Sequence, residues 1–153
     1  MANIVFNIAK GRVAELYDRV KSNDPANSAI ILIPIETSGL EADSVLIDAD
    51  TVAAVLAGAT NEQSTMGRKT LTDSDLASIP APDDTNDRNE RSLPTVTWTA
   101  ASGNAISKIL VAYDPDTTGG TDANLVPLTM FDFAQTPSGA DIQMTTGTFF
   151  RAS

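Results

Sequence analysis

The side chains that most often carry covalent or metal chemistry are missing from this chain of 153 residues. It contains neither cysteine nor histidine. A Ser-His-Asp triad, a thiolate nucleophile, a zinc site built on thiolate or imidazole, and a haem ligand of the usual kind are therefore impossible. Catalysis would have to rely on carboxylates, lysine, serine or tyrosine alone.

Among those remaining groups, Ser107 and Lys108 are adjacent and have nucleophile and base character. They fall in a predicted strand, where neighbouring side chains leave opposite faces of the sheet, so the two cannot act as a pair. Two pairs of carboxylates have the residue types needed for acid–base chemistry: Asp48 with Asp50, and Asp83 with Asp84. Because these pairs lie among turn and capping residues, without apolar surroundings to raise a pKa, we interpret them as structural.

The segment 114–122 (DPDTTGGTD) places oxygen ligands at short spacing around two glycines, as a calcium loop does. The ligand candidates are Asp114, Asp116, Thr118 and Asp122. A calcium loop between helices also needs a bidentate glutamate at its twelfth position, and Leu125 stands there between predicted strands. No Gly-Lys-Ser or Gly-Lys-Thr follows the glycines, so a phosphate cradle is not supported. We interpret the segment as a hairpin turn and expect no metal and no cofactor.

The charge balance narrows the range of partners. Twenty acidic and ten basic residues give a net charge of -10 and a pI near 4.2. Such a surface repels a phosphate backbone, so nucleic acid is not an expected partner. The longest apolar run, AIILIPI at 29–35, is too short to cross a membrane, and no secretory signal pattern opens the chain. We expect synthesis in a cytoplasm and no membrane partner.

Hydrophobic spacing predicts the elements of the N-terminal half. Apolar residues alternate from Ile4 to Ile8, which predicts a strand, and residues Arg12–Lys21 have the spacing of an amphipathic helix. A nearly continuous apolar strand is predicted over Ser28–Glu36, although Pro34 favours an edge position or a bulge. A second short helix is predicted over Thr51–Ala57, capped by Asp50 and closed by Gly58 in a left-handed turn.

The second half divides into a polar segment and a series of strands. Residues 77–94 contain three prolines and a mixed charge cluster, which predicts an exposed loop or arm. The last third is predicted to form an antiparallel meander of short strands separated by Pro, Asp and Gly turns. Its predicted strands are Thr95–Ala100, Ile106–Tyr113, Leu125–Phe133 and Asp141–Thr146. We expect Trp98 and Phe131 to be core residues rather than ligand-stacking platforms.

Together these patterns predict a single domain over residues 1–153 of α+β, mainly β class. The expected architecture is an antiparallel β-sandwich or meander with two short helices in the N-terminal half. A core of this size is self-sufficient, since a domain of about 150 residues buries roughly two-thirds of its unfolded surface. Without cysteine, its stability must come from packing or from neighbouring subunits.

Three consecutive segments of the last third have a recognisable pattern: VTWTAASGNAISKILV (96–111), VAYDPDTTGGTDANLVPLTMFDF (111–133) and TPSGADIQMTTGTFFRAS (136–153). In these segments the chain resembles the small virion structural proteins of tailed bacteriophages. The resemblance covers roughly Thr95 to Ser153, and the opening MANIVFNIAKGRVAELYDRV has a similar character. The resemblance implies a particle component on the capsid exterior or at the neck, and it implies no catalytic residue.

From this resemblance we expect a non-enzymatic capsid decoration protein, bound to the outside of the head and forming a homo-oligomer. Its expected partners are the major capsid protein or other virion proteins. The alternatives are a neck or tail structural protein, a cytosolic protein-binding module and, more remotely, an enzyme using carboxylates alone.

Two segments are candidate contact sites. The loop at 77–94, which carries charges of both signs, is expected to contact the shell. The C-terminal segment 148–153 is expected to contact other copies in the oligomer or its own fold, because two adjacent phenylalanines on a strand point to opposite faces. The candidate interface residues are Asp83, Asp84, Asp87, Arg88, Glu90, Arg91, Phe149 and Phe150.

Overall fold

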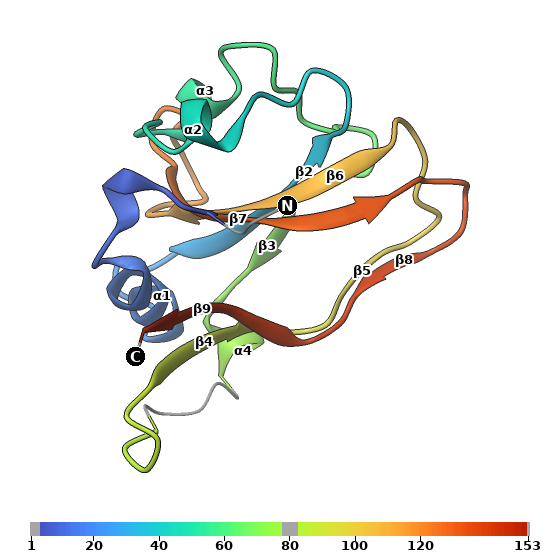
Figure 1. Cartoon of the computed structure of the whole chain (residues 1–153). Coiled ribbons are helices and arrows are strands. Elements are labelled where there is room, and N and C mark those ends of the chain that lie inside the picture. Colours follow the sequence, from blue (N-terminus) through green and yellow to red (C-terminus); the bar gives the residue numbers. More distant parts are fainter. Residues whose placement is uncertain (1–3, 78–82, 153) are drawn as a thin grey trace.

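The chain folds as a mainly β, α+β protein with antiparallel sheets, which confirms the predicted fold class (Figure 1). Strands account for 36% of the chain and helices for 17%. The computed structural model describes residues 4–77 and 83–152. Four short α-helices accompany the strands in these ranges, where the sequence predicts two.

A five-stranded antiparallel sheet forms the centre of the molecule. Its strands lie in the order β1 (Ile4–Val5), β7 (Val126–Gln135), β6 (Ile106–Asp114), β2 (Ala29–Glu36) and β3 (Lys69–Leu71). Two of the inner strands, β2 and β6, pair along nearly their whole length, and all but one of the β2 side chains are buried. Burial on both faces explains why this strand has no polar alternation.

Pro34 lies in a central strand, so the predicted edge position is wrong. The carbonyl of Pro34 accepts a hydrogen bond from the amide of Gln63, at 2.9 Å. The amide and the carbonyl of one strand residue point toward the same neighbouring strand. The amide hydrogen that proline lacks would therefore point toward residues 62–63 and not toward β6. On that side of β2, the pairing with β3 ends at Leu32. The ladder with β6 therefore loses nothing at Pro34, and the register shift falls just after it, between Ile35 and Glu36.

Helices cover the two faces of this sheet (Figure 1). On one side lie α2 (Asp43–Leu46) and α3 (Val52–Val55); on the other lie α1 (Val13–Lys21) and α4 (Asp73–Leu76). The predicted amphipathic helix is confirmed in α1, whose apolar positions are all buried: Val13, Leu16, Tyr17 and Val20.

A second, smaller layer is a twisted two-stranded ribbon that lies on the α1 side of the sheet (Figure 1). β4 (Asn89–Leu93) pairs with β9 (Gly147–Ala152), and β5 (Val96–Trp98) continues into a pairing with β8 (Ile142–Met144). Of the strands in the last third, only β6 and β7 pair as chain neighbours. The strand order therefore departs from a meander, because the segment after β7 crosses to the second layer.

Two boundaries near the N-terminal half differ from prediction. The first strand stops at Val5, and Asn7–Ala9 form a 3-10 helix. The second predicted helix shortens to α3, and its cap is Thr51, whose hydroxyl accepts from the Ala54 amide at 3.1 Å, rather than Asp50. Gly58 does not adopt the left-handed conformation that the sequence predicts, and the nearest group to a Cβ there would be the end of the flexible Glu41 side chain.

The prediction of an exposed loop over 77–94 is wrong for its second half. Residues 89–93 form β4, and Arg91 and Leu93 are buried. Residues 78–82 lie outside the described ranges. The sequence misses this strand because its partner is β9, more than fifty residues away, so no local pattern announces the pairing. In the parts of the chain that the structure describes, no helix is long and apolar enough to cross a membrane.

Candidate functional site

The ribbon ends in a tight turn that carries four of the eight predicted contact residues. Backbone hydrogen bonds join Asp83 and Arg88 across this tip, which we define as residues 83–88. The Asp83 carboxylate accepts from the amides of Thr85 and Asn86, at 3.1 and 3.2 Å, and from the Asn86 side chain at 2.7 Å. These bonds lower the pKa of Asp83, the largest contribution coming from the Asn86 side chain. The tip is thus held by its own side chains.

Charges of both signs continue from the tip onto the ribbon. Arg88 Nε lies 3.2 Å from Asp83 Oδ2 and 3.7 Å from Glu90 Oε1, and Arg151 on the opposite strand lies 3.4 Å from the same Glu90 oxygen. Asp84 and Asp87 remain exposed at the end of the turn, where Asp87 has a left-handed φ of 50°. Two acidic side chains of the tip, Asp84 and Asp87, are therefore exposed, while Asp83 and Arg88 are held by contacts within the tip and the ribbon.

Arg91 belongs to the interior and not to the exposed contact set, which corrects its predicted role. Only 4% of its side chain is exposed; its Nη2 lies 2.6 Å from Asp18 on α1, and its guanidinium lies 6.0 Å from the Tyr17 ring centre. The Tyr17 hydroxyl donates to the Ser92 carbonyl at 2.5 Å. Burial raises the pKa of this phenol above its ordinary value. These contacts attach β4 to α1.

Phe149 and Phe150 are both partly buried and pack against the core, so neither ring is left without core contacts. Arg91 pairs with Phe150 and Ser92 pairs with Thr148, which leaves Phe149 as an extra residue in a β-bulge. A bulge interrupts the two-residue alternation, and both rings can then turn inward. Phe149 lies against Tyr17, with ring centres 5.6 Å apart.

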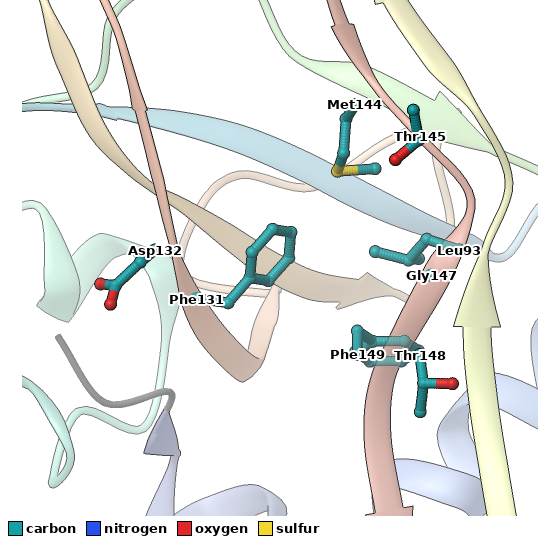
Figure 2. A pocket seen from close by; sticks show the side chains of 8 residues that line it. All are labelled: Leu93, Phe131, Asp132, Met144, Thr145, Gly147, Thr148 and Phe149. Atoms are coloured by element: carbon teal, nitrogen blue, oxygen red, sulfur yellow. The ribbon is translucent and has the colours of Figure 1, made fainter.

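An apolar slot lies between β7 and the ribbon (Figure 2). Its volume is about 140 Å³, and it is lined mainly by Leu93, Phe131, Met144 and Phe149. Phe131 is only partly buried, so its predicted place in the core holds in part, whereas Trp98 is 1% exposed, as expected. Figure 2 shows Phe131 pointing toward the slot and Asp132, next on β7, pointing away from it.

Asp132 instead lies beside Lys108, a buried charged residue that was not among the predicted site residues. Lys108 is fully buried, with Nζ 2.9 Å from Asp43 Oδ1 and 3.4 Å from Asp132 Oδ1. Asp132 is its cross-strand partner on β7, and Asp43 begins α2. The signal was a lysine inside the apolar run ISKILVAY, which requires a paired charge if the strand is central. Ser107 faces away, donating to Thr37, so the predicted separation from Lys108 is confirmed.

Arg68 joins the 114–122 turn to the segment before β3. It donates to both oxygens of Glu62, at 2.8 and 2.5 Å, and to both oxygens of Asp122, at 2.6 and 2.9 Å. These bonds raise the pKa of Arg68, Asp122 contributing most, and lower that of Asp122. Asp114 and Asp116 accept backbone amides of the turn itself. Within residues 4–77 and 83–152, no group of three acidic side chains could hold a metal ion.

The structure therefore separates the predicted interface residues into three groups. Asp84 and Asp87 are exposed at the tip, and Asp83, Arg88 and Glu90 are joined by ion pairs. Arg91 is buried, and the two phenylalanines pack against the core. The slot was not predicted, because its walls come from four strands. In comparisons with known proteins, no family model matches the chain, and no curated protein or solved structure matches it either.

Proposed function

We propose that this chain is a non-enzymatic structural protein of a tailed bacteriophage, bound to the outside of the head as a capsid decoration protein. The observation that best supports this proposal is the ribbon and its tip. A two-stranded arm stiffened by Asp83 and anchored through Arg91 holds exposed carboxylates away from the body. A contact element ordered in advance loses less entropy when it binds.

The charged groups favour binding over catalysis. Lys108 and Arg68 each lie between two carboxylates, so neither offers a free amine or guanidinium to a substrate. The slot of about 140 Å³ is below the roughly 300–1,000 Å³ of small-molecule sites. Together with the sequence resemblance of residues 95–153 to phage virion proteins, this supports attachment by surface contact.

Quantitative mass spectrometry of purified virions tests the proposal. A decoration protein is expected at a copy number comparable with that of the major shell protein. A few copies per particle would move the assignment to the neck or tail, and absence from particles would leave a cytosolic binding module.

The role of the tip is tested with undecorated heads and a charge reversal. Asp84→Lys changes an exposed acid of the tip, and Asp50→Lys makes the same change at an exposed position outside the ribbon. We expect Asp84→Lys to lower head occupancy at moderate salt and Asp50→Lys to leave it unchanged, with equal melting temperatures. Equal occupancy of the two variants would remove the tip from the contact surface.

A further inference from the structure

The apolar slot lies beside a strand edge. Among the described residues, β9 pairs only with β4, so the backbone donors and acceptors on its other edge have no strand partner. The same strand lines the slot through Gly147, Thr148 and Phe149. Figure 2 shows the slot between β7 and the β8–β9 side of the ribbon. An unpaired edge beside an apolar pocket is the arrangement that binds an added strand, with the edge holding its backbone and the pocket one side chain.

The size of the slot sets the size of that side chain. A cavity of about 150 Å³ lined by apolar side chains holds a benzene ring, and the slot measures about 140 Å³. One aromatic or branched aliphatic residue fills it. Phe131, Phe149, Leu93 and Met144 supply the apolar part of the walls and Thr145 and Thr148 the polar part, so an anchor there would lie partly against apolar side chains.

Charge distinguishes a second copy of this chain from another protein as the occupant. The chain has a net charge of -10, and most of its ten basic residues are already held in ion pairs within the fold. The basic residues in such pairs are Arg12, Arg19, Arg68, Arg88, Arg91, Lys108 and Arg151. A second copy would bring the same excess of acidic residues, whereas a segment with Lys or Arg near its anchor would bring opposite charge and be attracted.

We propose that β9 and the slot bind an extended segment of another particle protein, which adds as a strand and places one bulky apolar residue, flanked by basic residues, in the slot. This inference rests on the proposed function for the identity of the partner, and it supplies the mode of attachment.

Gly147 offers a direct test. It pairs with Leu93, so a side chain at 147 would share the face on which Leu93 lines the slot. A Cβ at Gly147 would meet only the Thr145 carbonyl, at 3.9 Å, so Gly147→Leu fills the slot without a backbone clash. Gly119, in the exposed 114–122 turn, has no atom within 4 Å of such a Cβ, which makes Gly119→Leu the matched control.

Binding of these variants to undecorated heads is measured by sedimentation and compared with wild type. Gly147→Leu should bind about tenfold more weakly or worse, as expected when a central anchor is lost, and Gly119→Leu should bind like wild type. Wild-type occupancy of a folded Gly147→Leu would overturn the proposal. If Gly147→Leu does not fold, Thr145→Lys, at the slot rim, should weaken binding and Thr145→Glu should not; equal effects would overturn the basic-segment assignment.

A photo-crosslinking amino acid at position 145, used in infected cells, separates this inference from the proposed function. A crosslink to an apolar-and-basic segment of a virion protein, lost in Gly147→Leu, supports both. A crosslink to a protein that is not part of the particle, also lost in Gly147→Leu, would support the slot as a binding site and contradict the decoration role. Crosslinked dimers of this chain, or no crosslink that depends on Gly147, would overturn the slot as a site for a partner strand.

Discussion

At the scale of single residues, Trp98 joins three parts of the chain. Its ring packs 6.2 Å from the Phe133 ring, its Nε1 donates to the Gly67 carbonyl at 2.9 Å, and the Lys69 ammonium lies 5.9 Å from the ring centre. The second layer meets the central sheet through this side chain. A ligand-stacking role would require an exposed ring, and only 1% of this residue is exposed.

Replacing Trp98 with alanine should therefore lower the free energy of unfolding by about 3–5 kcal/mol, as truncation of a buried large aromatic does. Trp98→Phe keeps an aromatic ring and loses the hydrogen bond to Gly67, so its cost should be about 1–2 kcal/mol. Urea denaturation of the three proteins measures both. Intact stability of Trp98→Ala with impaired partner binding would instead make Trp98 an interface anchor.

Lys108 provides the second prediction at this scale. Removing one member of a buried ion pair costs about 3–5 kcal/mol, and Lys108→Ala takes away the ammonium that lies 2.9 Å from Asp43. Asp43 and Asp132 keep side-chain exposures of 29% and 31%, so water reaches them and Lys108→Ala should fall near the lower end, about 3 kcal/mol.

Arg12→Ala is the control for this variant, since Arg12 is 50% exposed and lies 3.7 Å from Glu15. Its effect should stay below about 0.5 kcal/mol. Similar denaturation midpoints for Lys108→Ala and Arg12→Ala would show that the buried pair contributes nothing net to stability.

At the scale of elements, the Arg68 clamp connects the 114–122 turn to the chain segment before β3. Hydrogen bonds from Arg68 depress the pKa of Asp122 below its ordinary value of 3.8 in the folded state. A depressed folded-state pKa adds stability above the unfolded-state pKa and loses it as the pH falls through the folded-state value. The clamp should therefore be fully effective at neutral pH and weaken below about pH 4.

Asp122→Asn removes this pH-dependent contribution. We expect the variant to be less stable than wild type at pH 7 and to approach it in acid, so that the two curves of unfolding free energy converge below about pH 4. Asp84→Asn removes an exposed carboxylate of the tip and is the control. A constant stability difference between Asp122→Asn and wild type from pH 7 to pH 2 would contradict the assignment.

The elements differ in how far the sequence predicts them. The position of helix α1 follows from its hydrophobic period, and that of strand β2 from its continuous apolar composition. β4 has the polar sequence NERSL, and it becomes a strand only because β9 pairs with it and α1 receives Arg91. The slot is even less accessible to prediction, since its walls meet through tertiary packing and a bulge.

At the scale of the whole molecule, charge is distributed unevenly. Basic residues are mostly neutralised within the fold, so the net charge of -10 belongs largely to the outer surface. Complementary long-range charge accelerates encounter and is screened by salt, with a Debye length near 10 Å at 0.1 M and about 3 Å at 1 M.

Association with undecorated heads should therefore slow as sodium chloride rises from 0.05 to 0.5 M, while dissociation changes less. Stopped-flow or surface-based kinetics with heads as the immobile partner measure both rates. Association independent of salt would argue against a basic docking partner and would leave shape and apolar contact as the basis of recognition.

The strand order also determines when each strand can find its partner during synthesis of the chain. Several strands pair with partners that are synthesised much later: β2 pairs with β6, and β1 pairs with β7. In the same way, β4 pairs with β9, and β5 pairs with β8. A nascent chain thus emerges from the ribosome with the apolar AIILIPI stretch unpaired by β6 until residues 106–114 have been made. Refolding that depends on such distant strand pairings should take milliseconds to seconds, as measured by stopped-flow fluorescence of Trp98. Refolding in microseconds would contradict this dependence on distant pairings. If refolding is slow, the period in which apolar strands are exposed is chiefly the synthesis of the chain.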